Sequence, residues 1–230
     1  MTSTRTGTVP PSVPWRVAIL AFDGVEALDF AGPFEVFTTA SRMHRRTLAH
    51  PQATASPDLF DVFSVSATGA GSIVTARAGL RLVSDHGFDD APQADVLVVP
   101  GGVVDQPMAS SATLRWIAAQ SATATLSASV CTGAFLLVAS GVIGAGDRVT
   151  THWEDVADLR AAFAALNPPL DVVQDVRWID DGKAVSSAGI SAGIDMSLHL
   201  VERLAGRVLA QRTARQMDFR LDRERLRASS

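Results

Sequence analysis

The sequence predicts an α/β protein built on a mostly parallel sheet with helices on both faces. Short, continuous apolar runs, such as those at residues 15–22 and 94–102, are typical of strands that are buried on both sides. Segments with the apolar spacing of helices follow most of these runs. Strands that alternate with helices in this way indicate a parallel sheet, because each parallel connection needs a crossover.

The expected elements follow one another from the N-terminus. A strand at 15–22 leads into a helix at 28–42, which Pro33 interrupts near its start. The other elements are assigned from apolar periodicity and from the Asp181-Gly182 turn signal. Strands or extended segments are expected at 60–67, 79–88, 94–102, 124–131, 148–153 and 176–189, the last of these as a hairpin. Helices are expected at 110–120, 132–143, 154–166 and 191–204, and a solvated, charge-rich helix at 211–227.

Length and composition place the chain among single-domain globular proteins. It has 230 residues, of which 47% are hydrophobic and 19% charged, and its formal net charge is −4. A chain of this length suits one domain, which we place at 15–230 after a flexible tail at 1–14. The near-neutral charge argues against nucleic-acid binding. No apolar run reaches the ~20 residues that span a bilayer, and the absence of a signal-type apolar segment at the N-terminus predicts a cytoplasmic protein.

The single cysteine, Cys131, lies where an expected strand meets an expected helix. The segment resembles a nucleophile elbow, in which a tight strand-to-helix turn lifts a reactive side chain out of the sheet. A helix N-terminus at this place favours the thiolate and predicts a lowered pKa for Cys131. The alternative is an inert buried cysteine. Because sites in open α/β sheets lie beside the carboxyl ends of the strands, we treat Cys131 as a candidate nucleophile.

Three further candidates lie near the same edge of the expected sheet. Gly101 and Gly102 close the strand at 94–102, where their N–H groups can donate to a developing anion; an ordinary turn is the alternative. Asp29 follows the first strand among apolar neighbours, where a raised pKa suits proton transfer; an N-cap is the alternative. His152 precedes an expected helix, and a lone histidine in such a place is more often structural than catalytic.

The sequence carries no signature of a metal or redox cofactor, and we expect neither. Its five histidines lack the spacing of metal ligands, and one cysteine cannot build a thiolate zinc site. The glycine pattern of a dinucleotide site and a phosphate-binding loop are both missing.

Five blocks of the sequence resemble the ThiJ/PfpI superfamily of class I glutamine amidotransferase-like proteins. They are Leu28-Asp29-Phe30-Ala31-Gly32-Pro33, Val99-Pro100-Gly101-Gly102, Val130-Cys131-Thr132-Gly133, Thr150-Thr151-His152-Trp153 and the run from Ala188 to Asp195. The resemblance extends from Trp15 to about Leu204, which is nearly the whole chain. It implies a flavodoxin-like three-layer sandwich, a homodimer and catalysis without a cofactor.

Within this superfamily the blocks are most similar to those of isonitrile hydratases. The likeness implies hydration of a small isonitrile to an N-substituted formamide, with Cys131 as nucleophile, Asp29 as acid and base, and Thr132 beside them. It implies that substrate binding and charge stabilisation fall to Gly101, Gly102, His152 and Ile190. Thr132 stands where peptidase-like relatives place a histidine, so the sequence departs from the pattern of a Cys-His hydrolase.

Other roles stay open at this level. A glyoxalase- or amidase-like enzyme of the superfamily would use the same cysteine, although glyoxalase-type members typically place a glutamate near the first strand. A thiol-oxidation sensor would use Cys131 stoichiometrically. A non-catalytic domain would bind a small ligand, as in the N-terminal domains of AraC-type regulators, whose helix-turn-helix region this sequence is too short to include.

Overall fold

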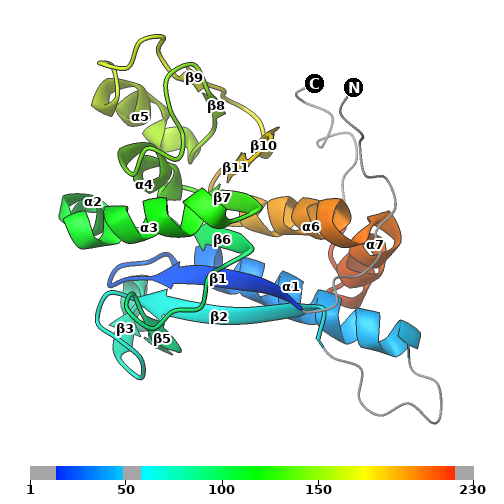
Figure 1. Ribbon diagram of the computed structural model, residues 1–230. Coiled ribbons are helices and arrows are strands. Elements are labelled where there is room, and N and C mark those ends of the chain that lie inside the picture. The colour runs from blue at the N-terminus through cyan, green and yellow to red at the C-terminus, as the bar shows by residue number, and fades with distance from the viewer. Residues whose placement is uncertain (1–13, 49–57, 221–230) are drawn as a thin grey trace.

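A seven-stranded sheet forms the middle layer of the computed structural model, which describes residues 14–48 and 58–220 (Figure 1). The strand order is β10-β11-β7-β6-β1-β2-β5, and neighbouring strands run parallel except for the antiparallel hairpin β10–β11. The strands are β1 (Trp15–Ala21), β2 (Phe60–Ser66), β5 (His86–Gly87), β6 (Val96–Val99), β7 (Leu126–Val130), β10 (Trp178–Asp181) and β11 (Ala184–Ser187). The predicted mostly parallel α/β sheet is confirmed.

Helices cover both faces of this sheet, which gives a three-layer sandwich (Figure 1). One face packs against α1 (Ala27–Leu48) and α6 (Ala192–Ala205), and α7 (Arg207–Gln216) packs on these two helices. The other face packs against α3 (Ser111–Thr123) and α4 (Gly133–Ala139), and α5 (Val156–Ala162) adds to the same apolar cluster beside β9. Side chains of β1 alternate between the two cores, with Val17 and Ile19 in the first and Ala18 and Leu20 in the second. Burial on both faces explains why this strand is a continuous apolar run.

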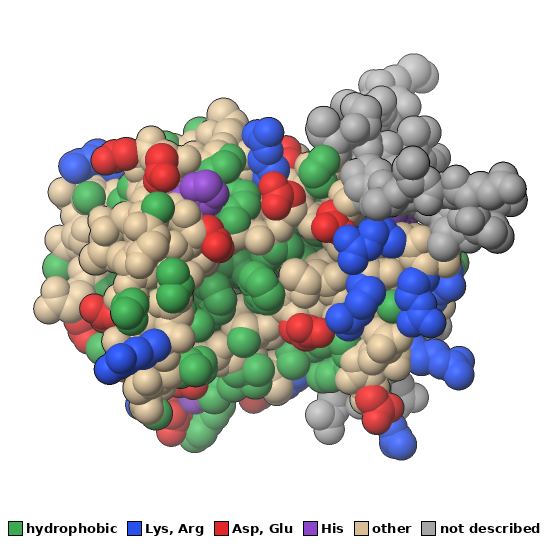
Figure 2. Space-filling model, turned by 90° about the horizontal axis from the view of Figure 1, so that it is seen from below, with side chains coloured by type: hydrophobic (Ala, Val, Ile, Leu, Met, Phe, Trp, Pro, Cys, Tyr) green, Lys and Arg blue, Asp and Glu red, His purple; other side chains and the backbone are tan. Residues whose placement is uncertain are grey.

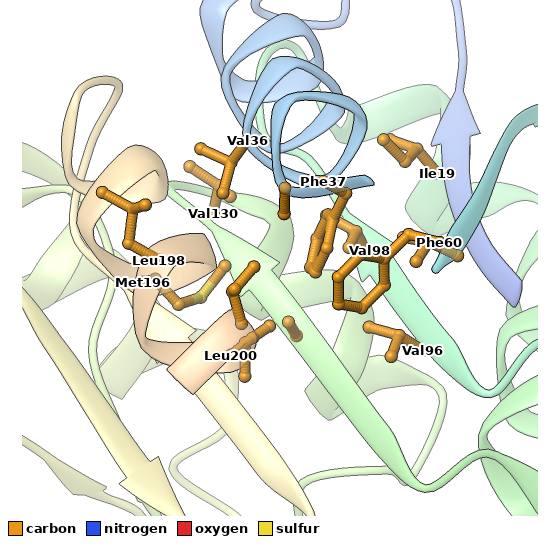
Figure 3. Packing of buried hydrophobic residues seen from close by; sticks show 14 of the residues in the cluster. Ile19, Val36, Phe37, Phe60, Val96, Val98, Val130, Met196, Leu198 and Leu200 are labelled. Carbon is orange, nitrogen blue, oxygen red and sulfur yellow. The ribbon is translucent and has the colours of Figure 1, made fainter. Parts of the chain in front are cut away.

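The core beneath α1 and α6 fixes the helices that carry part of the candidate site (Figure 3). The ring of Phe37 lies 5.1 Å from that of Phe60, centroid to centroid. Met196 and Leu200 enter the same cluster from α6. Phe37 and Met196 are fully buried, and each side chain of this size contributes roughly 1.5–3 kcal/mol when it is removed from water.

The short elements differ most from the prediction. The expected strand at 148–153 is reduced to β8 (Arg148–Val149), which pairs with β9 (Asp171–Val172) outside the main sheet. A second small sheet consists of β3 (Ile73–Thr75) and β4 (Arg81–Val83), and α2 (Asp105–Ala109) is a further unpredicted element. Hydrogen bonds that the Asp23 and Asp85 carboxylates accept from backbone N–H groups, rather than long apolar runs, hold the segments around β3 and β4.

The expected solvated helix at 211–227 is wrong in position and in exposure. Helix α7 begins at Arg207 and ends at Gln216, and it buries Leu209, Ala210, Thr213 and Ala214 against the α1 side of the sheet. Its many arginines hid this narrow apolar stripe in the sequence. The part of the prediction beyond residue 220 lies outside the described residues, as does the expected tail up to residue 13.

The connectivity brings three chain segments to one edge of the sheet. β1 lies between β2 and β6, so the chain first extends the sheet to one side of β1 and later to the other. Such reversals are the usual ligand-binding positions of open parallel sheets. Asp29 lies just after β1, Gly101 just after β6 and Cys131 directly after β7. The fold therefore places the residues singled out in the sequence at a common edge.

Candidate active site

Cys131 occupies a strained turn between β7 and α4. Its φ is +56°, a left-handed conformation that costs a non-glycine residue about 1–3 kcal/mol. The surrounding backbone maintains it, because the Cys131 N–H donates to the carbonyl oxygens of Ser187 at 3.1 Å and Ala188 at 3.3 Å. The Thr151 hydroxyl donates to the Cys131 carbonyl at 2.9 Å. The geometry is that of the predicted elbow, and Thr151 is a supporting residue that sequence reasoning missed.

Asp29 lies in the first turn of α1 and is completely buried. The Gly101 N–H donates to its Oδ2 at 3.1 Å, whereas Oδ1 has no hydrogen-bond partner among the described residues. Its bond thus reaches another strand end rather than an N–H of its own helix, which argues against the N-cap alternative. One carboxyl oxygen of Asp29 is therefore shielded from solvent and has no hydrogen bond to the described residues.

Burial raises the pKa of Asp29 to about 7. The negative charge of Glu26 raises this pKa further, while the Gly101 N–H, the Cys131 thiol and the Ile190 N–H lower it. Neither the thiol nor the Ile190 N–H forms a hydrogen bond of normal geometry with Oδ1. Gly101 links the carboxyl to the cysteine, because its N–H donates to Asp29 and a Cβ added to it would lie 2.8 Å from Cβ of Cys131. A group with this pKa can gain and lose a proton near neutral pH.

Burial also raises the pKa of the Cys131 thiol, to about 12, and the charge of Asp29 adds to the effect. The Thr132 N–H and hydroxyl lower this pKa, without reversing the shift. The expectation of a lowered pKa therefore differs from the structure. Helix α4 has only seven residues. The effect of its dipole on the thiol is smaller than the combined effects of burial and of the Asp29 charge, which raise the pKa. The resting site holds a thiol, and the adjacent carboxylate is the base that could accept its proton.

Alkylation of Cys131 by iodoacetamide is expected to show a pH midpoint above the free-thiol value of about 8.5. In Asp29→Asn the midpoint should fall, because the carboxylate that repels the thiolate is gone. Mass spectrometry of samples quenched across a pH series measures both midpoints. A wild-type midpoint below 8 would show that the turn activates the thiol despite its burial.

Thr132 and Gly102 hold each other by two hydrogen bonds. The Gly102 N–H donates to Thr132 Oγ1 at 2.9 Å, and this hydroxyl donates to the Gly102 carbonyl at 3.0 Å. Gly102 has a φ of +135°, and an added Cβ would lie 2.3 Å from the Gly24 carbonyl oxygen. The N–H groups of Gly101 and Gly102 thus bind Asp29 and Thr132, which differs from the expectation that they face a substrate anion. Both glycines therefore position site side chains through their backbone N–H groups.

Thr132→Val is expected to lower the free energy of unfolding by about 1 kcal/mol, because both polar groups of Gly102 lose their partner. Thr132→Ser is the matched control, since it retains the hydroxyl and should lose less stability. Urea denaturation of the two variants measures the difference. Equal stabilities would show that the hydroxyl bonds add nothing to the fold.

Ile190 closes the site from the turn that precedes α6. It has a φ of +51°, and its side chain is 40% exposed. Arg177 braces this turn: its guanidinium pairs with Asp195 through Nε and Nη2 and donates to Ser191 Oγ at 3.3 Å. The Arg177 carbonyl accepts the Ala188 N–H at 2.9 Å. Sequence reasoning missed Arg177, because no motif marks it and its partners lie more than ten residues away.

His152 lies at the rim of the site beside two acidic residues. Its Nδ1 is 3.3 Å from Asp155 Oδ2 and accepts the Glu154 N–H at 3.4 Å. The ring packs on Gly189, where an added Cβ would lie 2.0 Å from Cδ2. This arrangement makes His152 part of the wall rather than the base of a Cys-His pair.

Ile190 also lines a hollow of about 590 Å³. Residues of its wall include Trp153, Asp175, Val176, Arg177, Ala188 and Ile190. We call this space the rim hollow. Within the described residues, no three His, Cys, Asp or Glu side chains are grouped to hold a metal ion, and no helix is long and apolar enough to cross a membrane.

The fold and the site together define a class of protein: an α/β sandwich with a cysteine on a strained strand-to-helix turn beside a buried carboxyl. The chain belongs to the DJ-1/PfpI family, whose sequence model matches residues 15–203. It is 33% identical over 207 residues to isonitrile hydratase of Pseudomonas putida, which covers 89% of this chain and 78% of that enzyme. The resemblance to the ThiJ/PfpI group is confirmed.

Regulators and solved structures are also similar to this chain. The HTH-type transcriptional regulator GbdR of Pseudomonas aeruginosa is 30% identical over 204 residues, which is 88% of this chain and 50% of the regulator. A THiJ/PfpI family protein from Pseudomonas syringae gives a TM-score of 0.73 at 25% identity and covers 96% of this chain and 83% of its own. Drosophila melanogaster DJ-1beta shares the fold, with a TM-score of 0.72 at 19% identity over 91% of this chain and 100% of its own.

Proposed function

We propose that this protein is a cysteine-dependent, cofactor-free hydratase that converts isonitriles to N-substituted formamides. The observation that carries the proposal is the pairing of Cys131, on its strained turn, with Asp29, a buried carboxyl whose pKa is about 7. The similarity to isonitrile hydratase of Pseudomonas putida supports the same reaction. The terminal carbon of an isonitrile, R–N≡C, accepts a soft sulfur nucleophile and then a proton, and this pair of residues provides both.

The first half of the proposed reaction forms a covalent intermediate. The Asp29 carboxylate takes the proton of the Cys131 thiol as the sulfur attacks the terminal carbon. The same carbon then receives that proton from Asp29, which leaves the thioimidate R–N=CH–S–Cys131. Because the thiol starts protonated, this route needs no preformed thiolate. Holding the sulfur and the carboxyl together avoids the entropic cost of assembling them for each turnover.

The second half consumes water and restores the thiol. Asp29 removes a proton from a water molecule that adds to the thioimidate carbon, and then protonates the nitrogen. The tetrahedral adduct R–NH–CH(OH)–S–Cys131 collapses as its C–S bond breaks, and the hydroxyl proton passes through Asp29 to the departing sulfur. The products are the formamide R–NH–CHO and the free thiol.

Purified protein mixed with a simple isonitrile tests the proposal. We expect loss of the isonitrile stretch in the infrared, with a formyl proton appearing in the NMR spectrum at the same rate. A heated sample of the same protein serves as the control. An unchanged isonitrile band at micromolar protein would contradict the hydratase.

The similarity to GbdR favours one alternative, a domain that binds a small molecule without converting it. Such a domain would retain the fold while leaving the isonitrile intact. Titration calorimetry separates the two cases, since a sensor shows saturable binding without heat from turnover.

We also propose a homodimer that forms through exposed apolar side chains near α1. Leu28 and Phe34 of α1 are 38% and 36% exposed, and Ile73, Leu80 and Val83 around β3 and β4 are more exposed still. Figure 2 shows hydrophobic side chains gathered near the middle of one face, with charged side chains around them. Patches of this kind on a soluble protein commonly mark an interface.

Light scattering at micromolar concentration is expected to give twice the chain mass of 24.2 kDa. Phe34→Lys should shift the protein toward the monomer, because it places a charge in the proposed interface. Val208→Lys, at an exposed position of α7, is the matched control. A monomeric wild-type protein would refute the proposal.

A further inference from the structure

The rim hollow is built on the same chain segments as the candidate active site. One wall continues from Thr151, whose hydroxyl holds the Cys131 carbonyl, into His152 and Trp153. A second wall begins at Ala188, whose carbonyl accepts the Cys131 N–H, and ends at Ser191. Both walls thus adjoin the backbone of Cys131, and Ile190, whose N–H lowers the pKa of Asp29, lines the hollow itself. The volume of the hollow, about 590 Å³, lies in the usual range of small-molecule pockets.

Exposed apolar side chains provide the chemistry of this hollow. The indole of Trp153 is 72% exposed, and Ile190 is 40% exposed. Val176 and Ala188 add smaller apolar surface to the same wall. A large exposed indole beside a cavity offers a flat contact surface for a ring or a branched alkyl group.

The charges around the hollow disfavour an anionic ligand. Asp175 belongs to its wall, and Glu154 and Asp155 flank His152 at the rim. The guanidinium of Arg177 is the cation of the wall, but it is paired with the Asp195 carboxylate. A carboxylate on a ligand would meet these like charges, and among the wall residues described above no unpaired cation would balance it.

We infer that the rim hollow binds the substituent R of the isonitrile. It selects neutral substrates in which R is aromatic or a branched apolar group, and Trp153 is the specificity-determining residue. The inference rests on the proposed hydratase function. An isonitrile group is linear at nitrogen, so R extends straight away from a carbon placed at the Cys131 sulfur, and we place R in the hollow that Ile190 lines. Binding energy from R then helps to hold the reacting carbon beside the sulfur.

Substituent size gives the first test. The kcat/KM of wild-type protein should be higher for benzyl isonitrile than for methyl isonitrile. Trp153→Ala should lower kcat/KM for the benzyl substrate by about tenfold or more, the scale of a lost apolar contact, and leave the methyl substrate within about twofold. Trp153→Phe keeps an aromatic surface and should retain most of the preference. Val208→Ala, at an exposed position of α7, should change neither value.

Substituent charge gives the second test. Ethyl isocyanoacetate and the isocyanoacetate anion carry the same isonitrile group, and the wild-type protein should prefer the neutral ester. Asp175→Asn should narrow this preference, because it removes a wall charge while asparagine tolerates the φ of +60° at this position. Circular dichroism checks that each variant is folded.

Each outcome has a distinct meaning. If the wild type converts isonitriles but Trp153→Ala slows benzyl and methyl substrates equally, the specificity role is refuted and the hydratase stands. If Asp175→Asn leaves the charge preference unchanged, the electrostatic part of the inference is refuted. If the wild type converts no isonitrile, the proposed function fails, and this inference fails with it.

Discussion

Cys131→Ala is expected to abolish isonitrile turnover, with a loss of roughly 10⁴- to 10⁶-fold in kcat. The reason is that in the proposed first step the thiol provides both the sulfur that attacks the substrate carbon and the proton that Asp29 then delivers to that carbon. Asp29 would remain in place, but a carboxyl alone has no nucleophile to activate. Cys131→Ser should also be nearly inactive, since a hydroxyl is a poorer nucleophile toward a soft carbon and is harder to deprotonate.

The fold should survive both substitutions. Alanine and serine are no more strained at a φ of +56° than cysteine is, and the backbone bonds that hold the turn do not involve the side chain. Steady-state assays and thermal melts of the same samples measure the two effects separately. Full activity in Cys131→Ala would remove covalent catalysis from the proposal, and the thermal melt excludes misfolding as the cause of an activity loss.

The arrangement of the site could be predicted from the sequence where it depends on strand ends. Apolar runs fixed the positions of β1, β6 and β7, and parallel strands bring their carboxyl ends to one edge. Gly101 and Cys131 follow β6 and β7 within two residues, and Asp29 follows β1 in the first turn of the next helix. Local sequence patterns, together with the rule that the carboxyl ends of parallel strands share one sheet edge, therefore predicted that these three residues lie close together.

Features that depend on distant partners could not be predicted in this way. The pairing of Arg177 with Asp195 and Ser191 joins a loop to the start of α6, and local periodicity marks neither the pairing nor Arg177. The pKa of Cys131 is another case, because the sequence shows the adjacent helix but not the depth of burial or the neighbouring carboxyl. Desolvation is a property of the packed core.

Asp29→Asn is expected to lower kcat by roughly 10²- to 10⁴-fold, the usual contribution of a positioned acid or base. The amide has nearly the same shape and can still accept the Gly101 N–H, so the site should remain assembled. In the wild type, kcat/KM should rise with pH through about 7, as Asp29 becomes the carboxylate that accepts the thiol proton. The variant should lack this rise. A rise that persists in Asp29→Asn would assign the titration to another group.

The same substitution should make the protein more stable at neutral and alkaline pH. The pKa of Asp29 is about 7 in the folded protein against an ordinary value of 3.8, so between these two values the folded state keeps a proton that the unfolded state has lost. The wild-type free energy of unfolding must therefore fall as pH rises through this window, by about 4 kcal/mol in total. Asparagine does not titrate, so the variant should not lose this stability. The difference in melting temperature between variant and wild type should therefore increase from pH 4 to pH 8, on the order of 10 °C for a chain of this size. Thermal melts across this pH series measure the difference. A difference that does not change with pH would mean that Asp29 is ionised throughout, and its role as a proton carrier would be lost.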